Sequence, residues 1–221
     1  VAVSGAGPAW RACARIAAGR GHRVTVFEAT NRAGGQLALW ASAPSTKELG
    51  RVIDWRLDEL DRLGVSIDFN RIMERQDILN LGTDVVVIAT GAMDSCREFA
   101  GTAGIEVISP HELLGGLPLT ASRALVLNEG RGQAGLAAAE ALLHQDIATE
   151  IVTSDIAVAA DIDPTNRSAW YERLGKKNCL FTAAHIVDSV DRQKVILRNV
   201  FDDRLSTREG IDLIVDWPGC Q

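Results

Sequence analysis

The first residues of the chain have the types and spacing of a loop that binds a phosphate group. Gly5 follows a short apolar run and permits a tight turn, and Gly7 leaves room for the backbone to approach an anion. Pro8 suits the first turn of the helix that should follow, because its missing N–H would have no partner within that helix. The free N–H groups and the positive end of the helix dipole would then face a pyrophosphate.

An acidic residue lies at the expected distance after this loop. Glu28 directly follows the apolar segment 24–27, where a carboxylate can accept a hydrogen bond from a ribose hydroxyl. Strand, turn, helix, strand and acid therefore follow in the order of a dinucleotide-binding βαβ unit over residues 1–29. Trp10 departs from the pattern, because it stands where the third glycine belongs. An indole there should displace the helix or enter the ligand space, weakening nucleotide binding; the alternative is that it turns outward over apolar surface.

A second pair of glycines, Gly34 and Gly35, lies shortly after Glu28. Adjacent glycines allow the backbone to come close to a phosphate or a flavin ring, and Arg32 can place a cation beside a pyrophosphate. Alone, this segment reads equally well as a flexible loop with an exposed arginine. After a dinucleotide fingerprint, it indicates a flavin dinucleotide.

The rest of the chain alternates between expected helices and strands. A helix should run from about Thr46 to Gly64, and the continuous apolar run at 84–89 should be a buried strand. A second glycine-rich loop at 130–135 lies between an apolar strand at 124–127 and an apolar helix.

Two such units predict an α/β, Rossmann-like fold with two interlocked dinucleotide-binding βαβ subdomains. We expect a first half at 1–92, an inserted half at 93–211, and a truncated strand at 212–221 that returns toward the first half.

The composition narrows the class of protein. Of the 221 residues, 47% are hydrophobic and 24% charged, as in ordinary globular proteins. The formal net charge of -6 and the lack of a basic run argue against a nucleic-acid partner. No apolar stretch reaches the roughly 18 residues of a membrane span. None of the four cysteines forms a Cys-x-x-Cys pair, so we expect no dithiol centre, no iron–sulfur motif, and a reducing, cytoplasmic compartment.

We predict neither a catalytic residue nor a metal site in this chain. The four histidines lie far apart in the sequence, without carboxylates or cysteines at metal-ligand spacing. Glu140 is expected at a solvated helix position. Trp170 and Tyr171 are expected to serve packing or an interdomain contact rather than to stack on a ligand.

The chain resembles the two-dinucleotide-binding flavoproteins. More narrowly, it resembles the C-terminal part of the Old Yellow Enzyme-like multidomain oxidoreductases, which include 2,4-dienoyl-CoA reductase and the amine dehydrogenases and demethylases. The segments that carry the resemblance are 5–9, 26–29, 32–37 and 87–92, and the segments 166–171 and 195–200 resemble the amine dehydrogenase and demethylase branch.

The resemblance implies a site for FAD, or for ADP alone. Gly5, Gly7 and Pro8 would cradle the pyrophosphate, Glu28 would hold the adenosine ribose, and the segment 32–37 would face the phosphate and the flavin. The implied cofactor-binding residues are Gly5, Gly7, Pro8, Ala9, Glu28, Ala29, Arg32, Gly34, Gly35, Gln36, Leu37, Thr90 and Gly91. The FAD site would be incomplete, because this chain ends before the segment that supplies a flavin-contacting acidic residue in the family.

In the second unit, Gly130, Gly132 and Gly135 have fingerprint spacing and are candidates for holding NAD(P). The residue that matches Glu28 there is Thr153, with Asp155 two residues further on. A hydroxyl gives no clear ribose clamp, so neither NAD nor NADP is favoured. A second half that binds nothing stays open as an alternative.

The resemblance implies a redox module of a flavin-dependent oxidoreductase of the amine dehydrogenase, demethylase or enoyl reductase type. It would pass electrons to or from an upstream barrel domain of the same polypeptide, which carries FMN and a 4Fe-4S cluster and binds the substrate. The chain begins directly on an expected strand, so we expect a piece of a longer polypeptide that is inactive alone. An electron-transfer protein and further copies of the full-length chain are expected partners.

A function without redox chemistry is the alternative to this interpretation. The chain could be a non-redox scaffold that holds ADP, or nothing, and docks the barrel domain. A thioredoxin reductase-like enzyme is disfavoured, because the chain has no Cys-x-x-Cys pair.

Overall fold

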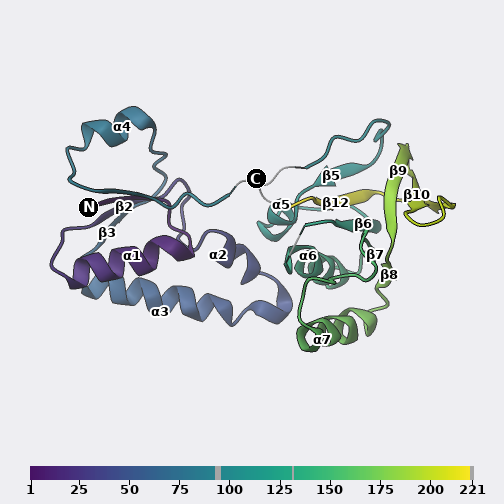
Figure 1. Cartoon of the computed structure of the whole chain (residues 1–221), viewed down its shortest axis with the longest axis horizontal. Helices are drawn as coiled ribbons and strands as arrows, with labels where there is room; N and C mark the ends of the chain where they lie inside the picture. The colour runs from purple at the N-terminus through teal and green to yellow at the C-terminus, as the bar shows by residue number, and fades with distance from the viewer. Residues whose placement is uncertain (93–95, 131, 220–221) are drawn as a thin grey trace. The chain divides into compact units, whose positions relative to one another are not determined.

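The structure is a computed structural model that describes residues 1–92, 96–130 and 132–219, apart from the side chain of Arg11. It divides into two compact units, Val1–Ala92 and Met93–Gln221. Each unit is built on its own parallel sheet (Figure 1).

The first unit contains a four-stranded sheet in the order β3-β2-β1-β4. All three strand pairs are parallel, so the carboxyl ends of the strands share one edge. The order reverses between β1 and β4, and such a switch point is where open α/β sheets bind ligands. The strands are β1 (Ala2–Ser4), β2 (Thr25–Phe27), β3 (Ser66–Asp68) and β4 (Val86–Ile88).

The helices of the first unit follow from its apolar pattern. They are α1 (Pro8–Gly19), α2 (Gln36–Trp40), the short 3-10 helix η1 (Pro44–Thr46), α3 (Leu49–Arg62) and α4 (Arg75–Asn80). Helices α1 and α3 lie along the same face of the sheet (Figure 1). Val3, Val26 and Leu60 are buried together in the core cluster of this unit, which shows how α3 and the central strands share one core.

The second unit contains a five-stranded parallel sheet in the order β5-β12-β6-β7-β8 and a three-stranded antiparallel sheet in the order β11-β10-β9. The parallel strands are β5 (Glu106–Ile108), β6 (Arg123–Asn128), β7 (Ala148–Val152), β8 (Leu180–Thr182) and β12 (Leu213–Trp217). The antiparallel strands are β9 (His185–Asp191), β10 (Lys194–Asn199) and β11 (Leu205–Glu209). The helices are α5 (Pro110–Leu114), α6 (Ala134–Leu143) and α7 (Pro164–Gly175).

The core of the second unit joins its two sheets. Leu125 and Leu127 of β6 are buried in one cluster with Val195 and Leu197 of β10. Helix α6 is alanine-rich and almost entirely buried, as its sequence, apolar except for Glu140, leads one to expect.

We predicted that residues 212–221 form a truncated strand that returns toward the first half, but most of this segment belongs to the sheet of the second unit. β12 is hydrogen-bonded in parallel to both β5 and β6, so residues 213–217 form a central strand of the second sheet. The reason is its apolar sequence, which suits a strand covered on both faces. A return of the chain beyond this strand stays a prediction, and residues 220–221 lie outside the described residues.

Candidate dinucleotide-binding site

The first glycine loop is held tightly against the end of β4. Gly5 has a φ of +98°, and a Cβ atom there would lie 2.3 Å from the carbonyl oxygen of Ala89. The N–H of Gly5 donates to the carbonyl of Phe27 at 2.8 Å, and the N–H of Ala89 donates to the carbonyl of Ser4 at 2.8 Å. Only glycine satisfies both the backbone angle and the space, so this residue joins the carboxyl ends of β1, β2 and β4.

Gly7 and Pro8 open helix α1 as a phosphate loop requires. Gly7 is the N-cap residue with an extended backbone, Pro8 takes the first helical position, and no side chain caps the helix. A Cβ atom on Gly7 would meet nothing within 4 Å, so this side of the loop is open. Ala9 is exposed beside it. The first N–H groups of this helix are therefore available to an anion.

The second glycine pair lies directly against the first loop. The N–H of Gly34 donates to the carbonyl of Ala6 at 2.8 Å. A Cβ atom on Gly35 would lie 3.0 Å from the Cα atom of Gly7, and Gly35 has a φ of +51°. Two segments that are separate in the sequence thus form one backbone surface, and a side chain at Gly35 would crowd it.

Glu28 is the buried carboxylate of this site. Its Oε2 accepts a hydrogen bond from the N–H of Ala6 at 2.6 Å, and its Oε1 accepts one from the N–H of Thr30 at 2.8 Å. The Thr30 hydroxyl lies 2.8 Å from Glu28 Oε1 and 2.9 Å from the carbonyl oxygen of Arg32. An ionised carboxylate offers about four acceptor positions, so capacity remains for a ribose hydroxyl. Sequence reasoning missed Thr30, although a hydroxyl residue two positions after the acid was a usable signal.

The remaining predicted cofactor residues lie around the same sheet edge. Gln36 opens α2, and its Nε2 lies 3.4 Å from the carbonyl oxygen of Ala92. Leu37 follows it in α2 and is half-buried. Thr90 and Gly91 follow β4 and are exposed, as are Ala29 and Arg32. The structure therefore brings the first-unit residues of our prediction to one edge, and their role in binding stays a prediction.

The side chain of Trp10 lies in the core of the first unit. It is 0% exposed and belongs to the same buried cluster as Val3 and Val26. Our expectation that the indole enters the ligand space or turns outward is therefore wrong. Trp10 lies on the inner face of α1, so its side chain points toward the sheet while the glycine loop keeps its shape.

All three glycines of the second loop are required by its geometry. A Cβ atom on Gly130 would lie 2.5 Å from Nε1 of Trp217, and one on Gly135 would lie 2.2 Å from Oδ1 of Asn128. Gly132 has a φ of +89°, and its N–H donates to a carboxylate oxygen of Asp161 at 2.7 Å. This loop therefore meets the glycine requirements of a dinucleotide-binding fingerprint, and a carboxylate of the same chain, that of Asp161, contacts it.

Thr153, which matches Glu28 by position, is turned away from solvent. It is 1% exposed, and its hydroxyl accepts from the N–H of Asp155 at 3.2 Å. Its side chain is therefore engaged within the protein and offers no ribose clamp at the surface.

Two weaker candidates are packing residues. Glu140 is 4% exposed, which corrects our expectation of a solvated position, and its carboxylate lies 3.7 Å from Nε of Arg173 on the neighbouring helix. Trp170 is buried and donates from its indole N–H to the side chain of Gln133 at 3.1 Å. Tyr171 stacks on Phe181 with ring centroids 4.4 Å apart.

The buried thiol of Cys179 is not activated for catalysis. Among the described residues, Cys13, Cys96 and Cys179 form no disulfide bond. Burial raises the pKa of Cys179 to about 12, which keeps this thiol protonated near neutral pH. Within the described residues there is no group of three histidine, cysteine or acidic side chains that could hold a metal ion. In the same part of the chain, no helix has both the length and the apolar character to cross a membrane.

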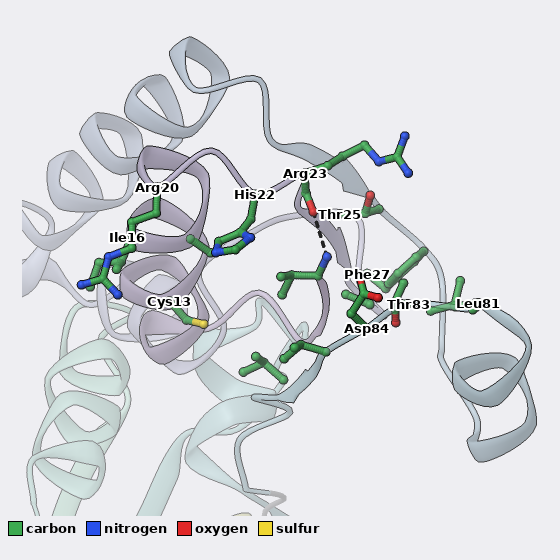
Figure 2. Close-up of a pocket in the computed structure, with 16 residues that line it drawn as sticks. Cys13, Ile16, Arg20, His22, Arg23, Thr25, Phe27, Leu81, Thr83 and Asp84 are labelled. Atoms are coloured by element: carbon green, nitrogen blue, oxygen red, sulfur yellow. Dashed lines mark hydrogen bonds between the residues drawn. The ribbon is translucent and has the colours of Figure 1, made fainter.

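A large groove of about 1030 Å³ lies in the first unit, away from the glycine loops. Its lining includes Val1, Thr25 and Val85, which mark the amino ends of the strands, together with Arg20 and His22 (Figure 2). The glycine loops lie at the carboxyl ends of the same strands. None of the residues that we predict to bind the cofactor lines this groove.

No protein-family model matches the chain. A probable N-methylproline demethylase of Rhizobium meliloti is 33% identical over 192 residues, which are 87% of this chain and 28% of that protein. An N,N-dimethylglycine/sarcosine dehydrogenase of Chromohalobacter salexigens is 32% identical over an alignment of 199 residues that covers 87% of this chain and 29% of that protein. The chain thus spans less than a third of the length of these relatives.

Solved structures share the fold. A histamine dehydrogenase from a Rhizobium species has a TM-score of 0.85 at 24% identity, over 97% of this chain and 35% of that chain. A thioredoxin reductase of T. acidophilum has a TM-score of 0.69 at 15% identity, over 99% of this chain and 76% of that chain. The chain therefore has the Rossmann-like α/β fold, with parallel sheets, of the two-dinucleotide-binding flavoprotein type, which confirms the predicted fold class.

The relatives found by sequence identify the family more narrowly than the solved structures do. The chain is homologous to the C-terminal FAD- and NAD(P)-binding region of the Old Yellow Enzyme-like oxidoreductases, and this confirms the resemblance found in the sequence. Its relatives are named as demethylases, dehydrogenases and reductases, so the chain belongs to a group of flavin-dependent oxidoreductases.

Proposed function

We propose that this chain is the FAD-binding module of an amine dehydrogenase or demethylase. The observation that carries the proposal is the meeting of Gly5, Gly7, Gly35 and Glu28 at the carboxyl edge of the first sheet. Bound FAD supplies hydride and single-electron transfer, and the protein supplies binding, orientation and electrostatics. The named activities of the relatives favour this branch.

The first loop fits a pyrophosphate in both space and charge. The open side of Gly7 leaves room for phosphate oxygens, and the uncapped start of α1 offers N–H donors to them. Gly35 keeps its backbone within reach of Gly7, where a side chain would fill the same space. Arg32 is exposed nearby in the sequence and is the proposed cation for the phosphate charge.

Glu28 fits the adenosine ribose. Its carboxylate is fixed by the N–H groups of Ala6 and Thr30 and keeps acceptor capacity for a hydroxyl donor. Gln36, Leu37, Thr90 and Gly91 are the proposed residues on the flavin side, because they lie at the end of β4 and the start of α2.

The remaining parts of the proposal concern the whole polypeptide. We place the substrate on a barrel domain with FMN and a 4Fe-4S cluster in the same polypeptide, since the relatives are more than three times longer than the matched region. An electron-transfer protein and further copies of the full-length protein are the proposed partners. We propose a reducing, cytoplasmic location, because Cys13, Cys96 and Cys179 form no disulfide bond among the described residues.

A scaffold that holds only ADP is the second candidate function. It is favoured by one observation: the most completely formed contacts, those of Glu28 and the first loop, are the ones that serve the adenosine half.

Titration of the purified chain with FAD and with ADP separates the two functions. We expect FAD to bind more tightly than ADP and to give the chain a flavin absorbance spectrum that survives gel filtration. Equal affinity for the two ligands would favour the ADP scaffold. Binding of neither ligand by a folded chain would overturn the proposed site.

We expect this chain alone to turn over no amine and no enoyl-CoA substrate, because the proposed substrate site lies on another domain. Steady-state assays with FAD and an artificial electron acceptor measure this, and a no-substrate reaction is the control. Amine-dependent reduction of the acceptor by the purified chain would contradict the proposed division of labour.

A further inference from the structure

An acidic segment lies against the glycine loop of the second unit. We define the β7–α7 segment as residues 154–163, which connect these two elements. At one end, the N–H of Ser154 donates to the carboxylate of Glu129 at 2.9 Å, and the Ser154 hydroxyl donates to the same carboxylate. Near the other end, Asp161 accepts the N–H of Gly132 at 2.7 Å. The segment therefore contacts the loop at two points.

The β7–α7 segment is held in place by the core behind it. Val158 is 0% exposed, and its carbonyl accepts the hydroxyl of Tyr171 at 3.1 Å. Asp163 ends the segment as the N-cap of α7 and accepts the N–H groups of Thr165 and Asn166. These contacts fix the chain on both sides of Asp161.

The same helix holds the start of α6. Gln133 is the N-cap residue of α6, and its side chain accepts the indole N–H of Trp170 from α7. Helix α7 thus positions both the glycine loop and the residue that contacts it, so the contact between Asp161 and Gly132 is a built feature of the fold.

The carboxylate of Asp161 lies where a glycine fingerprint of this type would bind a phosphate group. Gly132 is the second glycine of its fingerprint and corresponds to Gly7 in the first unit, where the helix begins without a side-chain cap. In the first unit, the carboxylate of Glu28 accepts the N–H of Ala6, the residue before Gly7. In the second unit, a carboxylate oxygen takes the N–H that would face the pyrophosphate.

The charged side chains of the β7–α7 segment are all carboxylates: Asp155, Asp161 and Asp163. Arg131 lies outside the described residues. A pyrophosphate at Gly132 would have to displace the carboxylate of Asp161, and like-charge repulsion disfavours holding both groups there.

We propose that Asp161 is an internal substitute for phosphate that keeps the second glycine loop closed to pyridine nucleotides. For the second loop to bind a nucleotide, the hydrogen bond between the Asp161 carboxylate and the N–H of Gly132 must break. This inference concerns the second unit and does not depend on FAD binding by the first.

The test is the titration of the full chain with NADH, followed by the amide NMR resonance of Gly132. In the unmodified chain we expect this resonance to stay unchanged. In Asp161→Ala we expect NADH to shift it, with an affinity at least about tenfold higher than that of the unmodified chain, because the competing charged hydrogen bond is gone. Asp161→Asn keeps an acceptor without the charge and should be intermediate.

Glu172→Ala is the matched control. It removes one carboxylate from the exposed side of α7, where Glu172 pairs with Lys176 at 2.6 Å, and should leave the Gly132 resonance insensitive to NADH. The amides of Gly7 and Gly35 report the first unit separately, so failure of the proposed FAD site is distinguishable. NADH binding of equal strength in the unmodified chain and Asp161→Ala would overturn the proposal. So would a folded Asp161→Ala chain whose Gly132 resonance ignores NADH.

Discussion

Trp10→Gly should remove much of the stability of the first unit. The indole is fully buried against the sheet, and its loss should cost about 3–5 kcal/mol through lost burial and the remaining cavity. Glycine in the first turns of α1 should add up to about 1 kcal/mol. Because whole domains are stable by only about 5–15 kcal/mol, the variant should unfold at a clearly lower urea concentration than the unmodified chain. Urea unfolding followed by circular dichroism measures the change.

Ala9→Gly is the matched control for Trp10→Gly. Ala9 is exposed on the same helix turn, so this variant carries the glycine cost without the cavity. We expect its unfolding midpoint to lie close to that of the unmodified chain. If Trp10→Gly instead kept its stability and bound ADP more tightly, the indole would crowd the phosphate site and its place in the core would be wrong.

Glu28→Ala should weaken ADP or FAD binding by about tenfold to over a hundredfold. The expected cause is the loss of a hydrogen bond to a charged group, which contributes about 1.5–3 kcal/mol. The structure adds a second cause: the N–H of Ala6 loses its acceptor, and the first glycine loop loses a support. Calorimetric titration of each variant with ADP measures the affinity.

Two further variants separate these causes. Glu28→Gln keeps an acceptor for Ala6 and removes the charge, so its affinity should fall between those of the unmodified chain and Glu28→Ala. Thr30→Val removes a hydroxyl that contacts Glu28 and leaves the carboxylate, so ADP affinity should change little. Equal ADP affinity in all of these variants would make Glu28 a structural acid only.

The local elements of the first site follow from nearby residues in the sequence. The glycines at 5 and 7, the proline at 8 and the acid at 28 each require a particular backbone geometry or position, and those requirements act within a few residues. Apolar runs predicted the buried strands β1 and β6, because a strand covered on both faces needs them. The prediction of a buried strand at 84–89 is wrong: β4 is the edge strand of its sheet, and Ile88 is 74% exposed. The relatives then confirmed the class of protein that these signals indicated.

Only the tertiary structure decided which of these elements touch. The approach of Gly35 to Gly7, the burial of Trp10, and the contact of Asp161 with Gly132 each join residues far apart in the chain. The place of β12 between β5 and β6 is of the same kind. Sequence patterns report the conformation of a segment and which face is apolar. They do not report the partner that covers that face, because packing and charge between distant segments decide it.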